Sequence, residues 1–170
     1  MSITDIFSSI HHKYLLKKYS STYHSRLPDS YVDTSQKLIN SKNISSNTKY
    51  LICVDTKRFR VNIFTGTKNK WTFVKNFICS LGKPSTPTPL GTYKIGAKGY
   101  SFGQNHGYIC YYYSQFKGNY VFHSILYNLN NTVRDGRLGI RICDGCIRLA
   151  KVNAKWIYDN VPYGTTVYIS

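Results

Sequence analysis

The sequence predicts a mainly β fold over residues 46–170, preceded by a helical N-terminal extension over residues 1–45. Sixteen tyrosines and eight phenylalanines among 170 residues favour strands, because aromatic side chains suit a pleated, half-buried surface. From Lys49 onward, apolar and polar residues alternate at a period of two, which is the period of a strand. Before that point the apolar residues follow helical spacing. A polar stretch from Asn40 to Thr48 separates the two patterns, so we expect two parts joined by a linker.

Two helices are expected in the extension. The second rests on a weak helical pattern after Pro28. The first rests on an apolar stripe at helical spacing, which suits a helix docked on the rest of the chain or one that binds a partner or a membrane surface. The histidines of this part have no cysteine or carboxylate at ligand spacing, so we interpret them as surface residues and expect no metal site. The stripe is Ile3, Ile6, Phe7, Ile10 and Tyr14, and the histidines are His11, His12 and His24.

The elements of the β-rich part follow from the same periodicities. Three prolines within 82–91 exclude a central strand there and predict a stiff, extended loop. A helix is expected over 151–160, with Val152, Trp156 and Ile157 facing inward. Strands are expected at 50–54, 59–64, 71–74, 77–79, 92–95, 108–116, 120–122 and 165–169.

The chain is strongly basic. It carries 23 Lys and Arg against seven acidic residues, a formal net charge of +16. Such a field attracts polyanions such as nucleic acid, anionic lipid or acidic wall polymers. The basic residues are scattered rather than run together, so an effect on solubility alone is an equal alternative. We expect no nucleic-acid partner, and membrane association stays open.

Targeting signals are not visible in this sequence. No stretch has the length of a transmembrane helix. The first 20 residues contain no continuous apolar core and no small-residue cleavage site, so no signal peptide is expected. Either export information is absent from this sequence or the protein works where it is made.

The segment from Arg141 to Leu149 holds the residues best suited to chemistry. Cys146 follows a glycine, and Gly145 allows a positive φ or a close approach of the backbone. We expect this turn at a strand-to-helix junction, where free N–H groups can stabilise a thiolate and an oxyanion. His123 lies 23 residues upstream at the end of an aromatic strand, and an imidazole is the usual partner for activating a thiol.

Three interpretations of this segment compete. Cys143 and Cys146 form a CxxC pair, which could be a redox dithiol, but the βαβ context typical of that motif is absent. The pair could be half of a zinc site, but the chain has no second CxxC. Five cysteines leave at least one without a partner in the chain. The third interpretation pairs Cys146 as nucleophile with His123 as base. The remaining cysteines, in apolar strands, are expected to be buried structural thiols: Cys53, Cys79 and Cys110.

Three sequence blocks resemble the L,D-transpeptidase catalytic domain, or YkuD family, over roughly residues 49–170. The first, at 80–93, is similar to the family's GxxxxxTPxGxF/Y strand and loop. The second is Phe122-His123-Ser124, similar to the strand that carries the base. The third, Asp144 to Leu149, is similar to the SxGCxR nucleophile turn. Each block alone is weak, and their order along the chain makes the resemblance specific.

The resemblance implies a β-sandwich with the cysteine and histidine at one end, under a hairpin lid. It implies that Cys146 attacks a tetrapeptide stem of peptidoglycan, that D-Ala leaves, and that an amine resolves the thioester into a 3→3 cross-link. It makes His123 the base and places the oxyanion at the N–H groups of Gly145 and Cys146, with Asp144 as a further candidate. It implies no cofactor, peptidoglycan stem peptides as partners, possible contact with anionic wall polymers, and a place in the cell envelope.

Two further residues have expected supporting roles. Arg148 matches the arginine of the family turn and would shape the site or meet a carboxylate, because an arginine keeps its charge. The backbone carbonyl of Ser124 could orient the imidazole, as a triad requires of its third group.

The sequence also departs from the family pattern. Cys143 and Asp144 stand where many members have Ser or Thr and then His, so only His123 can be the base unless His106 reaches the site. Asp144 could stabilise an imidazolium or cap the following helix. Cys143 could form a strained disulfide with Cys146. An L,D-carboxypeptidase, or a non-catalytic wall-binding module on the same fold, remains an alternative.

Overall fold

The computed structural model describes residues 28–170. The chain divides into two compact units, residues 1–33 and 34–170. The predicted first helix and the histidines at 11, 12 and 24 lie outside the described residues. Of the first unit, only the beginning of helix α2 (Asp29–Ser41) is described, which confirms the helix expected after Pro28. The predicted division at 45/46 stays a prediction.

Helix α2 is attached to the sheet by its residues from Thr34 onward. Ile39 is buried. The side chain of Asn40 accepts a hydrogen bond from the Trp71 N–H at 2.6 Å and donates one to the Trp71 carbonyl at 2.9 Å. Gln36 accepts from the Phe73 N–H at 2.8 Å. These bonds extend the edge of a strand with side-chain amides, so the helix is held by directed contacts as well as by burial.

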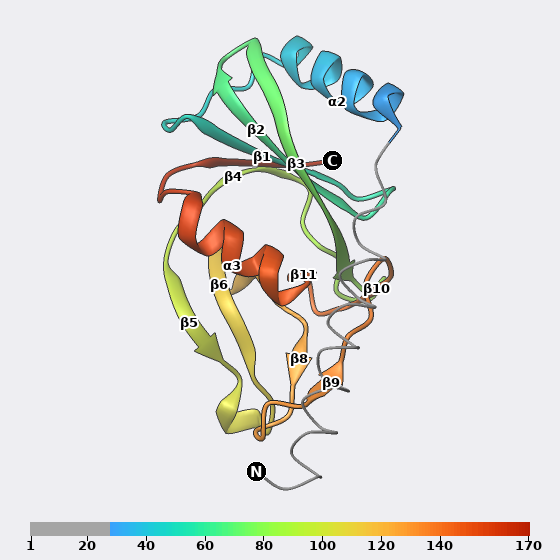
Figure 1. Ribbon diagram of the computed structural model, residues 1–170, viewed down its shortest axis with the longest axis vertical. Coiled ribbons are helices and arrows are strands. Elements are labelled where there is room, and N and C mark those ends of the chain that lie inside the picture. The colour runs from blue at the N-terminus through green and yellow to red at the C-terminus, as the bar shows by residue number, and fades with distance from the viewer. Residues whose placement is uncertain (1–27) are drawn as a thin grey trace, which may run out of the picture. The chain divides into compact units, whose positions relative to one another are not determined.

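The remaining elements confirm the mainly β prediction (Figure 1). Ten strands form one sheet, and its main path runs β4-β12-β1-β2-β3-β11-β7-β6-β5, with β10 beside β3. The strands are β1 (Tyr50–Asp55), β2 (Arg60–Thr67), β3 (Lys70–Gly82), β4 (Gly91–Lys94), β5 (Lys98–Phe102), β6 (Cys110–Lys117), β7 (Tyr120–Ser124), β10 (Arg141–Cys143), β11 (Ile147–Leu149) and β12 (Thr166–Ile169). A separate hairpin is β8 (Leu126–Tyr127) with β9 (Val133–Asp135), and η1 (Gln104–His106) precedes β6.

The sheet curls so that strands from its two ends meet. Tyr93 of β4 packs on Phe116 of β6, with ring centroids 5.8 Å apart. The backbone of Gln115 exchanges hydrogen bonds with Gly96 and Ala97, which lie between β4 and β5. The apolar core lies inside this curl and includes Ile147 and Leu149 of β11. The curl places β11, flanked by β3 and β7, in the middle of the protein.

Helix α3 (Lys151–Asn160) covers the core and matches the predicted bounds. Its buried residues are Ala154 and Ile157. Val152 is 70% exposed, so its predicted inward position is wrong. Val152 precedes Ala154 by two residues, which is about 200° around a helix, so the face set by Ala154 and Ile157 turns it to solvent. Trp156 is partly buried against the core.

Five strands were not expected from the sequence: β5, β8, β9, β10 and β11. β5 is a short edge strand with a glycine and two polar side chains, which weaken the alternation signal. β8 and β9 have two and three residues and exist only as a pair. Their hairpin is closed by hydrogen bonds between the backbones of Asn128 and Thr132 and of Asn131 and Asn128. Segments this short carry too little periodicity to be recognised.

The cysteines are free thiols. Cys53, Cys79 and Cys110 are buried in strands, as predicted, and Cys143 is buried as well. Within residues 28–170, no group of three His, Cys, Asp or Glu residues could hold a metal ion. The same residues include no helix that is long and apolar enough to cross a membrane.

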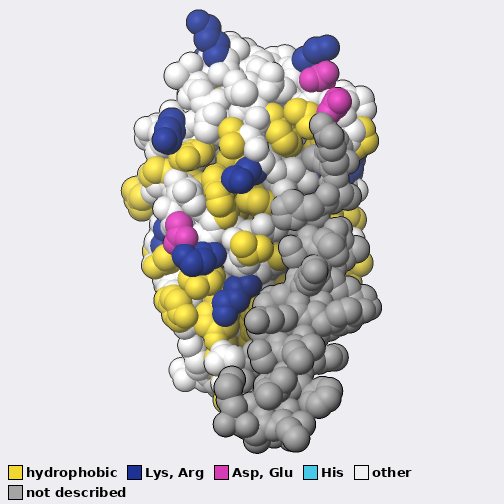
Figure 2. Space-filling view, viewed as in Figure 1, with side chains coloured by type: hydrophobic (Ala, Val, Ile, Leu, Met, Phe, Trp, Pro, Cys, Tyr) yellow, Lys and Arg dark blue, Asp and Glu magenta, His cyan; other side chains and the backbone are white. Residues whose placement is uncertain are grey.

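Basic side chains are spread over the face shown in Figure 2 rather than gathered. Most Lys and Arg side chains there stand apart from one another among apolar and uncharged groups, and some lie beside acidic side chains. Lysine side chains also lie over aromatic rings, such as Lys151 over Tyr111 at 3.6 Å and Lys155 over Tyr112 at 5.4 Å. Each such cation–π contact is stabilising. Some of the positively charged side chains therefore contribute to the stability of the fold.

Candidate active site

The turn before Cys146 needs a glycine. Gly145 has a φ of +90°, and a Cβ placed on it would lie 2.2 Å from the ring of Tyr120. A positive φ or a close approach of the backbone was expected at this position, and the structure has both. Cys146 itself is half-buried. Its thiol donates to the carbonyl oxygen of Asn119 at 3.7 Å.

The predicted strand-to-helix junction at Cys146 is wrong. Strand β11 separates Cys146 from helix α3, because Ile147 and Leu149 are fully buried and extend the sheet instead of starting the helix. Helix α3 begins at Lys151 after Ala150, and no described side chain caps its first turn. The helix therefore supplies no N–H groups to the thiol, and Asp144 is not its cap.

Asp144 instead attaches the turn to the proline-rich loop. Its carboxylate lies 2.6 Å from the ammonium of Lys83 and accepts a hydrogen bond from the Thr86 hydroxyl at 3.1 Å. The backbone N–H of Lys83 also donates to the Cys143 carbonyl at 2.8 Å. These contacts lower the pKa of Asp144, with Lys83 as the first cause. The stiff loop thus supports the turn, a role that the sequence analysis did not assign to it.

His123 is a buried, oriented imidazole on β7. Its Nδ1 lies 2.6 Å from the carbonyl oxygen of Ser124. A carbonyl can only accept, so Nδ1 carries the proton and Nε2 is left as an acceptor. The edge of Phe102 packs against the ring at 5.5 Å between centroids. Burial lowers the pKa of His123 to about 4, although the bond to Ser124 opposes this change.

Strand register places the thiol and the imidazole on one face of the sheet. In the parallel pair β11–β7, Ile147 lies opposite Phe122 and Arg148 opposite His123. Ile147 and Phe122 both point into the core, and successive side chains alternate between faces. His123 and Arg148 therefore share the other face, and the same alternation extended back to Cys146, which precedes β11, predicts that its side chain lies on that face as well. A hydrogen bond with the backbone of Val121, two residues before His123, also acts on the Cys146 thiol.

Burial raises the pKa of the Cys146 thiol, with the charge of Asp144 as a smaller cause and the Val121 bond opposing it. Together with a neutral His123, this makes thiol and imidazole the resting forms at neutral pH. The other histidine considered for the site, His106, is exposed in η1 and stacks on Tyr108.

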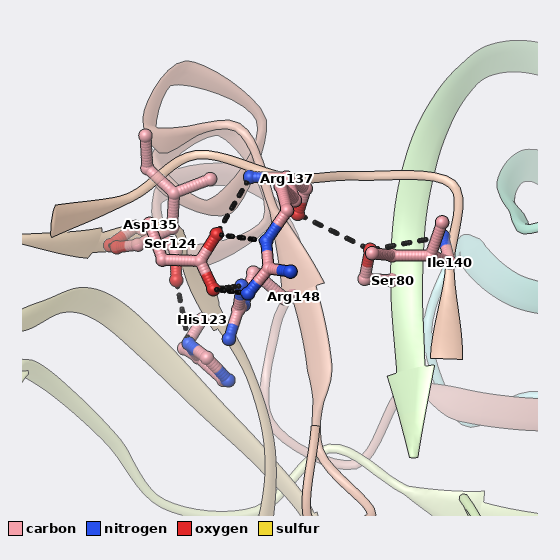
Figure 3. Close-up of polar contacts among 8 residues, drawn as sticks. Ser80, His123, Ser124, Asp135, Arg137, Ile140 and Arg148 are labelled. Atoms are coloured by element: carbon pink, nitrogen blue, oxygen red, sulfur yellow. Dashed lines mark hydrogen bonds and ion pairs between the residues drawn. The ribbon is translucent and has the colours of Figure 1, made fainter. Parts of the chain in front are cut away.

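Arg148 lies beside His123 inside a charged network (Figure 3). Its guanidinium is buried and contacts the carboxylate of Asp135 at 2.8 Å. Arg137 binds the same carboxylate at 2.9 Å. A carboxylate for Arg148 was one of the two expected roles, and the sequence analysis did not identify Asp135 as that partner. The sequence did offer one signal: it has only seven acidic residues, so few carboxylates were available as partners for Arg148.

Cys143, three residues before Cys146, is buried rather than at the surface. It is 5% exposed. Burial raises its pKa to about 11, and contacts with Arg148 oppose that shift. A buried, protonated thiol is a poor redox partner. The geometry therefore gives little support to a reactive Cys143–Cys146 dithiol.

Removing Lys83 and removing Asp144 should change the reactivity of the Cys146 thiol in opposite directions. Lys83→Met should leave the Asp144 charge uncompensated near Cys146 and slow alkylation of that thiol by iodoacetamide at pH 7.5 by a few-fold. Asp144→Asn should accelerate it by a similar factor, since a nearby anion disfavours a thiolate. The double variant should react at nearly the wild-type rate, and 1 M salt should shrink the differences. Equal effects of both single changes would contradict this account. Because the pair is exposed, stability should change by less than about 1 kcal/mol.

The family model for the L,D-transpeptidase catalytic domain matches residues 49–169. A putative L,D-transpeptidase of Bacillus subtilis, YciB, is 35% identical over 92 residues, which is 49% of this chain and 46% of the relative. A crystal structure of a fused Zn-dependent amidase/peptidase/peptidoglycan-binding domain-containing protein from Clostridium acetobutylicum is similar to 84% of this chain and 61% of that one, with 41% identity and a TM-score of 0.72.

The fold extends to more distant relatives. The structure of the L,D-transpeptidase LdtMt1 in complex with imipenem covers 72% of this chain and 59% of that one, with a TM-score of 0.56 and 20% identity. The chain spans about half the length of the Bacillus relative. The match over 49–169 and the curled sheet agree on one assignment: the chain belongs to the L,D-transpeptidase catalytic domain family.

Proposed function

We propose that this protein is a cysteine acyltransferase of the L,D-transpeptidase type that forms 3→3 cross-links between peptidoglycan stem peptides. The observation that carries the proposal is the bond between His123 Nδ1 and the Ser124 carbonyl. It leaves Nε2 of a neutral imidazole free to accept a proton on the face that also bears Cys146. Family membership supports the transpeptidase class.

The proposed reaction begins with thiol and imidazole both neutral. As Sγ of Cys146 bonds to the stem carbonyl carbon, its proton moves to Nε2 of His123. N–H groups of the Gly145–Cys146 turn would hold the oxyanion. The peptide C–N bond then breaks, the D-Ala amine leaves with the proton from His123, and a thioester remains. An amine of a second stem attacks the thioester and restores the thiol, whereas attack by water would give an L,D-carboxypeptidase.

Arg148 takes no part in proton transfer in this scheme. Its side chain is buried and bound to Asp135, so its proposed role is to shape the site beneath the imidazole. No step requires a cofactor. Peptidoglycan as the substrate implies work in the cell envelope. The basic surface suits anionic wall polymers. We include contact with them in the proposal, but the reaction does not depend on it.

The decisive experiment is intact mass spectrometry of the reduced, folded protein after incubation with imipenem, the ligand of the LdtMt1 structure. Opening of the β-lactam C–N bond by Cys146 should add the mass of one imipenem. Cys146→Ala should add none, and Cys143→Ser should still react. Absence of an adduct on the wild type would contradict the acyltransferase and favour a wall-binding module. Loss of the adduct in Cys143→Ser would favour the dithiol interpretation.

A disaccharide-tetrapeptide distinguishes the two acyl acceptors. Cross-linking predicts a dimer lacking one D-Ala, whereas hydrolysis predicts only the tripeptide product. The product masses therefore separate transpeptidase from carboxypeptidase.

A further inference from the structure

The β8–β9 hairpin brings one carboxylate to Arg148, on the face of the proposed catalytic strand pair that also carries His123. It directly follows the strand of His123 and ends at Asp135. Backbone bonds between Tyr127 and Ile109, at 2.8 and 2.9 Å, anchor it to the chain before β6. Arg134 also donates to the Gly107 carbonyl at 2.8 Å. The position of Asp135 is therefore fixed by contacts at both strands of its hairpin.

The Asp135 carboxylate is saturated with donors. Arg137 supplies its backbone N–H at 3.1 Å, Nε at 2.9 Å and a terminal nitrogen at 3.0 Å. Arg148 supplies a terminal nitrogen at 2.8 Å. These bonds hold the pKa of Asp135 well below its usual range, with Arg137 as the first cause. The carboxylate is thus an anion throughout the physiological pH range.

Arg148 depends on this anion more than Arg137 does. The Arg148 side chain is 6% exposed and the Arg137 side chain 65%. The Nε of Arg148 is buried without a partner among the described residues. A buried guanidinium whose charge water cannot screen needs a carboxylate nearby. The bond to Asp135 is the ion pair that the structure provides for it.

The imidazole of His123 is the neighbour that feels this guanidinium. Register sets the two side chains side by side, and Figure 3 shows them lying next to each other. Two further contacts of the ring within residues 28–170 are with uncharged groups: the Ser124 carbonyl on its own strand and Phe102 on β5. A cation here opposes protonation of the ring, as the effect of Arg148 on the His123 pKa shows.

We propose that Asp135 is a positioning residue that holds Arg148 and offsets its charge, so that His123 can take up the proton of Cys146. The inference rests on the proposed function, since it concerns the protonated imidazole formed during acyl transfer. With Asp135 intact, its carboxylate offsets part of the positive charge that Arg148 presents to the ring. Without it, the imidazolium forms beside an uncompensated positive charge, and the barrier to acylation rises.

Three variants test the inference through acylation by imipenem. Asp135→Asn should slow acylation at least tenfold. Arg137→Gln is the matched control, because it removes the exposed partner of the same carboxylate. It should change the acylation rate less than about twofold. Asp135→Asn combined with Arg148→Met should be at least threefold faster than Asp135→Asn alone, because both charges are gone. A double variant no faster than the single one would overturn the inference, since it would show that Asp135 only anchors the hairpin.

The NMR titration of the His123 ring, assigned with His123→Gln, decides the inference without any acylation. Arg148→Met should raise the pH at which the ring is protonated by about half a unit or more. An unchanged titration in folded Arg148→Met would overturn the inference. This readout also serves if Asp135→Asn does not fold.

A wild type that forms no adduct would contradict the proposed function, and the titration would still decide the coupling of Arg148 to His123.

Discussion

His123→Gln is expected to slow acylation of Cys146 by about a thousandfold at pH 7.5. A positioned general base contributes roughly 10²–10⁴ in rate. In this protein the thiol starts protonated, because burial raises its pKa, so little thiolate is present without the base. Glutamine preserves much of the shape of the imidazole but cannot take up a proton.

The measurement is the rate of imipenem adduct formation by intact mass spectrometry. His106→Gln is the matched control, since His106 is exposed in η1 and stacks on Tyr108. It should react at the wild-type rate. A large loss with His106→Gln and little loss with His123→Gln would reverse the assignment of the base.

The same variant has an expected signature in stability. The pKa of His123 is about 4 in the folded protein, against 6.5 for an unperturbed histidine. The unfolded chain therefore binds the proton first as the pH falls, and the wild type should lose roughly 3 kcal/mol of unfolding free energy between pH 7 and pH 4. Urea unfolding at several pH values should show a flatter profile for His123→Gln. Parallel profiles would contradict a buried, neutral ring.

Gly145→Ala is expected to damage both activity and stability. A left-handed backbone costs a residue with a Cβ about 1–3 kcal/mol, and here the Cβ would also lie 2.2 Å from the Tyr120 ring. That ring stacks on Phe116 at 6.3 Å, so it cannot yield without disturbing the core. A rotated turn would misdirect the proposed oxyanion donors, and loss of one such donor typically costs 10²–10³ in rate.

A second glycine provides the control. Gly164 has a φ of +81° and open space where a Cβ would stand. Gly164→Ala should lower the temperature of thermal unfolding, because the backbone at that position is strained. It should leave the rate of acylation by imipenem unchanged. Tyr120→Ala added to Gly145→Ala should recover part of the stability, because it removes the clash. Acylation of Gly145→Ala at the wild-type rate would argue against a catalytic role for the geometry of this turn.

Much of the fold was predictable because its signals are local. The alternation at 50–54 and 59–64 and the bounds of 151–160 correspond to β1, β2 and α3. The prolines kept 83–90 out of the strands. By contrast, the prediction that Val152 faces inward on α3 was wrong. Which side of a helix is buried depends on how the helix packs against the curled sheet, and the local sequence does not determine that packing. The hairpin of β8 and β9 is too short to show a period at all.

By itself, the sequence determined that the chain is mainly β and resembles the L,D-transpeptidases, and it singled out Cys146 and His123. Residue type and spacing carry that information, since a glycine before a cysteine and a histidine ending an aromatic strand are local features. Only the tertiary structure decided that β11 follows Cys146, that Lys83 binds Asp144, and that Asp135 meets Arg148. These pairings join residues 13 or more positions apart, and they form because β10 pairs with β3 and because the β8–β9 hairpin carries Asp135 to Arg148.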